Sequence, residues 1–229
     1  SGTVAAGANI AIGHQSMTDV DAVGSQHNTS IGYQSMNGTW ANTVSQYNVA
    51  IGSKTMQGVM DDADDNTAVG YEALKALTTG QKNTAIGKGS LTALTTGGIN
   101  VAVGNGAGAT MTGTSNTTLI GYLAGTAINS TDANGTVAVG YQALQDLTSG
   151  QNSVAVGYRA LADITTGDFN TAVGYAALDA ITTGNDNTAL GWGAGGSTAN
   201  TTGTNNTFLG GSAGNQIINR NDNTFVGYR

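Results

Sequence analysis

A short pattern of apolar and small residues recurs along the whole chain and ends each time in a glycine. Its clearest copy spans residues 66–74 and reads Asn-Thr-Ala-Val-Gly-Tyr-Glu-Ala-Leu. Neighbouring copies are 17 to 20 residues apart, and 17 is the most common spacing. A single repeat array therefore spans residues 1–229 and leaves no room for a separate linker or domain. The repeat glycines are Gly13, Gly32, Gly52, Gly70, Gly87, Gly104, Gly121, Gly140, Gly157, Gly174, Gly191, Gly210 and Gly227.

The three residues before each glycine have the composition of a short β-strand. The residue next to the glycine is always aliphatic, and the residue two positions earlier is Thr, Val or Ile. The position between them is alanine in nine copies, with Leu119, Phe208 and Phe225 as bulky exceptions. Alternating positions and β-branched residues favour strands. We therefore expect thirteen short strands with an aliphatic face in the core and a flat alanine face suited to close approach by another backbone.

Turn signals flank each predicted strand. Asparagine precedes the strand in ten copies, where its side chain can satisfy turn backbone and its own torsions can be left-handed. The glycine lets the chain bend without a clash from Cβ. The stretch after the glycine, for example 73–80, has leucines three positions apart and predicts either one helical turn or a second short strand.

Burial of the apolar face requires several copies of the repeat stacked on one another. A unit of 17 residues cannot bury an apolar face alone, but stacking builds a thin continuous core and places Asn and Thr where they can hydrogen-bond between coils. At about 4.8 Å per layer, thirteen coils predict a rod roughly 60 Å long. Aromatic residues just after the glycine, such as Tyr141 and Trp192, are expected to pack between coils or between chains. A parallel homotrimer is the closed arrangement we expect.

Composition excludes several classes of protein. The chain has no proline and no cysteine among its 229 residues, and only 9% of them are charged. Collagen and disulfide scaffolds are therefore excluded, and no apolar run is long enough for a membrane helix. The net charge is −7 and the seven cations are scattered, so nucleic acid is not an expected partner. A hydrophobic fraction of 39% at fixed positions argues against disorder.

The repeat resembles a known family. The motif Asn-Thr-Ala-Val/Ile-Gly-x-x-Ala-Leu at 66–74, 83–91 (with serine in place of the last alanine) and 170–178, with its variants at 48–52 and 153–157, is similar to the head repeats of YadA-like trimeric autotransporter adhesins and to repeats of bacteriophage tail fibres. The resemblance covers 9–229. It implies a left-handed parallel β-roll, three interlocked chains and attachment to a cell surface. The repeat here is longer than in those adhesins, and neither a stalk, a membrane barrel nor a tail-fibre chaperone domain is visible. We therefore expect an excerpt of a longer fibre.

Catalytic and cofactor-binding motifs are weak. Two histidines, His14 and His27, and no cysteine cannot supply a thiolate–imidazole pair or a soft zinc site. The segment 104–108 resembles a dinucleotide loop and 87–90 a phosphate loop, but both lack the spacing and the following helix. We expect no catalytic, cofactor or metal residues. The acidic run Asp61–Asp65 leaves one alternative open, since a solvated loop and a Ca²⁺ site are both compatible with it.

These observations predict a non-enzymatic structural and adhesive fibre segment. Its expected partners are two further copies of itself and a cell-surface glycan or protein, contacted by the longer units 33–47, 53–65, 122–135 and 192–205. Its expected location is extracellular, on a phage tail fibre or a bacterial surface. Two alternatives remain: a left-handed β-helix enzyme of the acyltransferase kind, and an ice-binding solenoid. Against the latter, Thr interchanges with Val and Ile in the strands, as buried positions do.

Overall fold

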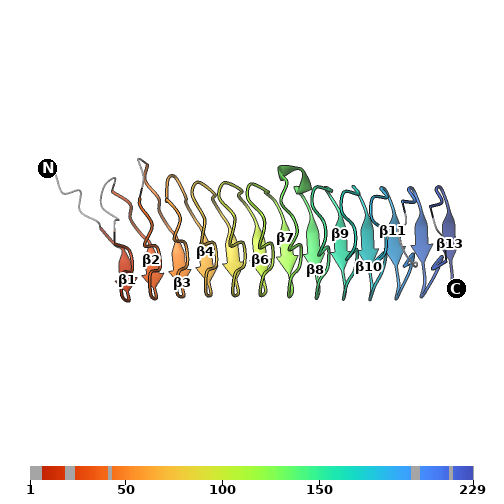
Figure 1. Ribbon diagram of the computed structural model, residues 1–229, viewed down its shortest axis with the longest axis horizontal. Helices are drawn as coiled ribbons and strands as arrows, with labels where there is room; N and C mark the ends of the chain where they lie inside the picture. The colour runs from red at the N-terminus through yellow and green to blue at the C-terminus, as the bar shows by residue number, and fades with distance from the viewer. Residues whose placement is uncertain (1–6, 19–23, 41–42, 197–201, 217–218, 229) are drawn as a thin grey trace.

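The computed structural model describes residues 7–18, 24–40, 43–196, 202–216 and 219–228. Within these ranges the chain forms one parallel sheet of thirteen strands, in which spatial order follows chain order. Figure 1 shows the strands side by side in a straight row, with one coil of chain between each strand and the next. The predicted β-solenoid is confirmed. The strands are β1 (Ile10–Ile12), β2 (Thr29–Ile31), β3 (Val49–Ile51), β4 (Thr67–Val69), β5 (Thr84–Ile86), β6 (Val101–Val103), β7 (Thr118–Ile120), β8 (Val137–Val139), β9 (Val154–Val156), β10 (Thr171–Val173), β11 (Thr188–Leu190), β12 (Thr207–Leu209) and β13 (Thr224–Val226).

Equivalent residues of successive repeats lie directly beside one another. In the pair β4 and β5, Ala68 lies opposite Ala85 and Val69 opposite Ile86. The same register holds for all twelve strand pairs, including those whose connecting units are longer. Insertions are therefore absorbed in the loops, and each residue type of the repeat forms a column that runs along the rod.

The core contains the alanine column of the strands and leucines from the opposite wall. Ala68, Leu74 and Leu77 are fully buried, whereas Ile86 in the aliphatic column of β5 is 40% exposed. The prediction that the aliphatic column packs in the core and the alanine column faces outward is therefore wrong. The physical reason is space: the two leucines reach across a narrow coil, so little more than a methyl group fits under most strands.

The bulky exceptions in the alanine column occupy space that leucine fills elsewhere. Next to Leu119 the leucine position is taken by Gly108 and Gly125, where an added Cβ would lie 2.9 Å and 2.8 Å from a Leu119 methyl carbon. Phe208 in the same way lies against Gly195, whose added Cβ would lie 2.6 Å from the ring. Core volume is therefore kept nearly constant along the rod while the residues that supply it change.

The segment after the glycine forms neither a helical turn nor a second strand. Alternate residues are left-handed, for example Glu72 with φ 57° and Leu74 with φ 48°. The backbone amides of Glu72 and Leu74 therefore point in opposite directions along the rod. The Glu72 amide donates to the Ser53 carbonyl of the preceding coil, and the Leu74 amide donates to the Ser90 carbonyl of the following coil. Among the described residues the single helix is the 3-10 turn η1 (Thr131–Ala133).

The repeat glycine is required by the backbone, as the sequence predicts. Gly70 has φ 140°, and a Cβ there would lie 2.5 Å from the carbonyl oxygen of Gly87 in the next coil. The other repeat glycines share the positive torsion. The chain therefore bends at the same place in each coil because only glycine fits there.

A buried asparagine ladder runs beside the strands. The Asn83 side chain donates from Nδ2 to Asn66 Oδ1 and to the Gly97 carbonyl, both at 3.0 Å. Its Oδ1 accepts from the backbone and side-chain amides of Asn100 at 3.1 Å and 3.0 Å. The predicted hydrogen bonding between coils is confirmed. The predicted left-handed torsion instead belongs to the preceding residue, here Lys82 with φ 58°.

Candidate functional site

The outer side of the sheet is an extended apolar surface, which we call the strand face. It consists of the first and third residues of every strand. Its aliphatic side chains in β8, β9 and β10 are partly exposed. Exposed aliphatic side chains lie on either side of these strands: Ile10, Ile12, Ile51, Ile86, Val101, Ile120, Leu190, Leu209 and Val226. Monomeric soluble proteins seldom expose so many apolar side chains along one surface. The strand face is therefore a candidate contact surface.

A row of stacked tyrosines follows the glycine bend. We call Tyr122, Tyr141, Tyr158 and Tyr175 the tyrosine ladder. Successive ring centroids are 5.3, 5.0 and 5.0 Å apart and the rings are nearly parallel. The predicted packing between coils is confirmed for these residues. Because each inner ring covers the face of its neighbour, the ladder presents ring edges to solvent.

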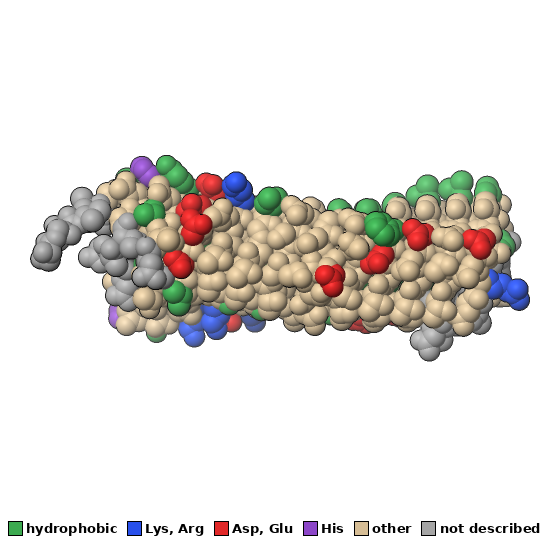
Figure 2. Space-filling model, turned by 90° about the horizontal axis from the view of Figure 1, so that it is seen from above, with side chains coloured by type: hydrophobic (Ala, Val, Ile, Leu, Met, Phe, Trp, Pro, Cys, Tyr) green, Lys and Arg blue, Asp and Glu red, His purple; other side chains and the backbone are tan. Residues whose placement is uncertain are grey.

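A surface pocket lies at the C-terminal end of the tyrosine ladder and has a volume of about 220 Å³. Asp179, Ser212 and Asn215 supply its polar side chains. Tyr175 and Trp192 are its aromatic residues, and they are 53% and 57% exposed. Figure 2 shows hydrophobic side chains gathered along one edge of the rod toward its C-terminal end, while charged groups are scattered elsewhere. The pocket, with aromatic and polar groups together, has the lining typical of a small-ligand site.

The carboxyl group of Asp179 is partly removed from water. Burial raises the pKa of Asp179, and the negative charge of Asp163 raises it further. The Arg159 guanidinium acts in the opposite direction. Arg159 also pairs with Asp163 at 3.2 Å. Backbone amides of Asp179 and Ala180 hydrogen-bond to this carboxyl group and also lower its pKa. The half-buried carboxylate has lone pairs enough to accept from a further donor.

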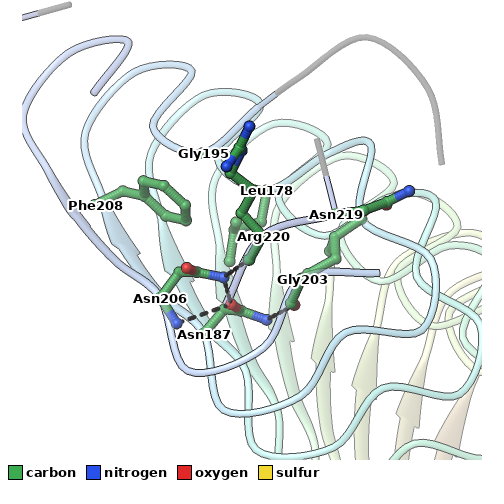
Figure 3. A pocket seen from close by; sticks show the side chains of 9 residues that line it. Leu178, Asn187, Gly195, Gly203, Asn206, Phe208, Asn219 and Arg220 are labelled. Atoms are coloured by element: carbon green, nitrogen blue, oxygen red, sulfur yellow. Dashed lines mark hydrogen bonds between the residues drawn. The ribbon is translucent and has the colours of Figure 1, made fainter. Parts of the chain in front are cut away.

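A second cavity lies inside the rod and is too small to bind a ligand. Figure 3 shows its walls, which include Leu178, Phe208 and the amides of Asn187 and Asn206. Its volume of about 10 Å³ is at or below the space that one water molecule needs. The two amides are joined by a hydrogen bond of 2.9 Å. This cavity is therefore a packing gap at the asparagine ladder.

In the glycine-rich loops noted in the sequence, every glycine amide donates to a carbonyl of a neighbouring coil. In the segment 104–108, the Gly106 amide donates to the Lys88 carbonyl at 2.9 Å. In the segment 87–90, the Gly89 amide donates to the Tyr71 carbonyl at 2.9 Å. Both loops are ordinary parts of the repeat. The two histidines stack on neighbouring aromatic rings, His14 on Tyr33 and His27 on Tyr47.

The acidic run Asp61–Asp65 directs its carboxylates to separate partners. Asp61 accepts from the amide and hydroxyl of Thr43, and Asp64 accepts from the Gln46 amide at 2.6 Å. Asp62 accepts from the Gln81 side chain at 3.1 Å. Within the described ranges no three His, Cys, Asp or Glu side chains form a group that could hold a metal ion.

The longer units predicted to carry receptor contacts differ in structure. The unit 122–135 contains η1, which is capped by the Ser130 hydroxyl. The unit 53–65 carries the acidic run. In the units 33–47 and 192–205, residues 41–42 and 197–201 lie outside the described ranges. Three residues of the pocket, Trp192, Gly193 and Gly196, belong to the last of these units, and the others come from the regular coils on either side of it.

Comparison with known proteins adds no relative. No protein-family profile, curated protein or solved structure matches the chain. In the described part of the chain no helix is long and apolar enough to cross a membrane.

Proposed function

We propose that this chain is a segment of a non-enzymatic adhesive fibre that assembles as a parallel homotrimer and attaches to a cell surface. The observation that supports this proposal is the strand face, which leaves apolar side chains exposed or partly exposed along the described rod. An extended in-register rod can present many copies of one contact surface at fixed spacing. The fibre would be extracellular, on a phage tail or a bacterial surface.

The strand face supports trimer formation because it is flat, carries no charged side chain and is aliphatic except for the threonines that begin eight of its strands. Three parallel rods with their strand faces turned inward would remove the exposed Ile and Val side chains from water. At about 25 cal/mol per Å² of apolar area, the gain grows with every coil that is added. The left-handed winding implied by the family resemblance belongs to this proposal.

The receptor would be a cell-surface glycan or protein. A trimer presents each contact three times, so weak contacts gain avidity if the receptor is present at high density. The recognising side chains would lie away from the strand face. The tyrosine ladder and the pocket at its end are on such a surface, because both begin after the glycine bend.

Light scattering on the purified chain tests the assembly. We expect a mass of about 68 kDa, three times the 22.8 kDa of one chain. Replacing two strand-face residues, Ile51→Glu and Ile86→Glu, should give monomers because each charge would be buried in the trimer. The control Thr96→Glu, on an exposed loop, should remain trimeric. A wild-type chain that is folded and monomeric would contradict the proposal.

Attachment is tested separately by adding fluorescent trimer to a panel of bacterial cells. Saturable binding that the Ile51→Glu, Ile86→Glu monomer loses would support an adhesive role and its dependence on avidity. A folded trimer that binds no cell in the panel would count against adhesion and leave only a structural spacer.

Ice binding is a second candidate function, favoured by the position of the threonines. Eight strands begin with Thr, and this position lies on the strand face. These threonines are partly or fully exposed, so the prediction from sequence that they are buried is wrong and no longer speaks against ice binding. Regular hydroxyl and methyl groups about 4.8 Å apart on a flat sheet could order water. Thermal hysteresis in solutions of the chain would favour this function, whereas its absence would leave the adhesive proposal.

A further inference from the structure

The pocket at the end of the tyrosine ladder exists because one coil lacks side chains where its neighbours have them. Gly193 occupies the second position after the repeat glycine, where other coils carry Gln142 or Arg159. Gly196 occupies the fifth position, where the preceding coil carries Asp179. The two glycines form the floor of a hollow three coils wide.

Polar groups from the flanking coils converge on this floor. The Asp179 carboxylate lies over Gly196, since a Cβ added there would be 3.0 Å from Oδ1. On the opposite side, Ser212 Oγ lies 3.7 Å from a Cβ added at Gly193. The Ser212 hydroxyl and the Asn215 side-chain amide have no hydrogen-bond partner among the described residues. The hollow therefore offers a carboxylate acceptor, a hydroxyl and an amide, the last two able to donate or accept.

Aromatic groups complete the lining. Tyr175 is the last ring of the tyrosine ladder, and the next coil contributes Trp192. The following coil has Gly211 in this column, and the ring of Tyr228 from the last coil lies over it. Tyr175 and Trp192 are both more than half exposed, so ring surface is available beside the polar groups.

We propose that this pocket binds one neutral hexose ring of a glycan. The proposal rests on the adhesive function proposed above and identifies the chemical class of its receptor. A pyranose has a face of C–H groups that packs on an aromatic ring, because the ring face carries negative partial charge. Its hydroxyls both donate and accept, which matches the Asp179, Ser212 and Asn215 set.

Size and charge select this ligand over others. The volume of 220 Å³ is below the lower limit of about 300 Å³ typical of pockets for larger ligands, so the pocket suits a single ring. The Asp179 and Asp163 carboxylates and the net charge of −7 disfavour a sialic acid or another anion. A quaternary ammonium would need aromatic faces on several sides, and this pocket has two aromatic residues.

Fluorescence of Trp192 gives a direct test. The chain has two tryptophans, and Trp40 is buried. In a Trp40→Phe background, Trp192 becomes the single reporter. The full chain is titrated with the methyl glycosides of glucose, galactose, mannose and N-acetylglucosamine, and with choline as the cationic probe. We expect a saturable change with at least one glycoside and a Kd on the order of millimolar for about a dozen ligand atoms.

A matched pair of variants tests the location. Gly193→Gln fills the hollow without new backbone strain, because Gly193 has φ 60° and Gln142 in the same column has φ 54°. Gly89→Gln is the control, since Gly89 shares this column, has φ 63° and has open space around it. Circular dichroism verifies that both variants fold. We expect Gly193→Gln to weaken glycoside binding at least tenfold and Gly89→Gln to leave it unchanged.

Three results would overturn the pocket proposal: no saturable response to any glycoside, a saturable response to choline alone, or glycoside binding that Gly193→Gln does not change. The cell-binding assay separates this failure from failure of the adhesive function. If the Gly193→Gln trimer still binds cells as the wild type does, the adhesive function is supported and the pocket is not the receptor-binding site.

Discussion

Residues 66–104 and residues 117–157 build the same coil from different side chains. The first stretch has alanine under the strand, leucine opposite and asparagine in the ladder. The second begins with Leu119 under the strand and glycine opposite, and replaces the ladder asparagine by Thr117, Thr136 and Ser153. Strand register is the same in both stretches. Register therefore comes from the backbone ladder and the glycine bend, while the interior columns supply stability.

Substitution of the repeat glycine should lower the free energy of unfolding equally in the two stretches, and by more than any other substitution considered below. Gly70→Ala and Gly121→Ala each place a Cβ against the carbonyl of the next coil's glycine at a positive φ. We expect each to lower the free energy of unfolding by roughly 4 kcal/mol or more. Urea unfolding followed by circular dichroism measures this. Gly89→Ala, at an open left-handed position, should cost much less. Equal losses at all three positions would show that the bend has no special role.

A double-mutant cycle tests whether a large side chain under the strand replaces the leucine of the opposite wall in filling the core. Leu119→Ala should cost about 3 kcal/mol because it opens a cavity beside Gly125. Gly125→Leu should also destabilise, since the new side chain meets Leu119. The double variant restores the arrangement of Ala68 and Leu74 and should recover roughly 1–3 kcal/mol relative to the sum of the single variants. Additive losses would contradict the exchange.

The asparagine ladder should contribute to the free energy of unfolding only where it is continuous. Asn83→Ala removes four hydrogen bonds and leaves the Asn100 amide and the Gly97 carbonyl unsatisfied, so we expect a loss of about 2 kcal/mol. Replacing the exposed Asn105, which lies outside the ladder and has no positive φ, by Ala is the control and should change stability little. A loss at Asn105 as large as at Asn83 would show that the ladder is not the cause.

In the stretch 117–157, where the asparagine ladder is interrupted, removing one hydroxyl should raise the free energy of unfolding slightly. Thr136 Oγ1 is buried and has no hydrogen-bond partner among the described residues. Thr136→Val keeps the shape and removes the unsatisfied group, so we expect a gain of about 1 kcal/mol. Thermal unfolding of the two chains measures it. A loss would mean that the hydroxyl has a partner, such as a bound water.

Much of the fold could be predicted from the sequence because the repeat fixes equivalent positions. The strands before each glycine, the bend and the ladder between coils all follow from residue type and spacing. Which strand face points inward did not follow, because Val and Ile outside and Ala inside reverse the usual rule. That assignment depends on how far Leu74 and Leu77 reach across the coil, which spacing alone does not give.

The pocket was also missed, since it depends on neighbouring coils rather than on a motif. Its sequence signal is the pair Gly193 and Gly196 in columns where other coils carry side chains. That signal becomes meaningful only when the coils are stacked and Asp179 and Asn215 are placed on either side. Aligning the repeats column by column, rather than searching for linear motifs, would have brought it to attention.

The orientation of the backbone hydrogen bonds has a mechanical consequence. They run between coils, along the axis of the rod, so tension applied to its two ends acts on all coil interfaces in series. The weakest interface should open first, and we expect it in the stretch 117–157 because the asparagine ladder is interrupted there. Each coil that opens releases roughly 55 Å of extended chain. A fibre built in this way would lengthen in steps under load and keep its remaining coils intact.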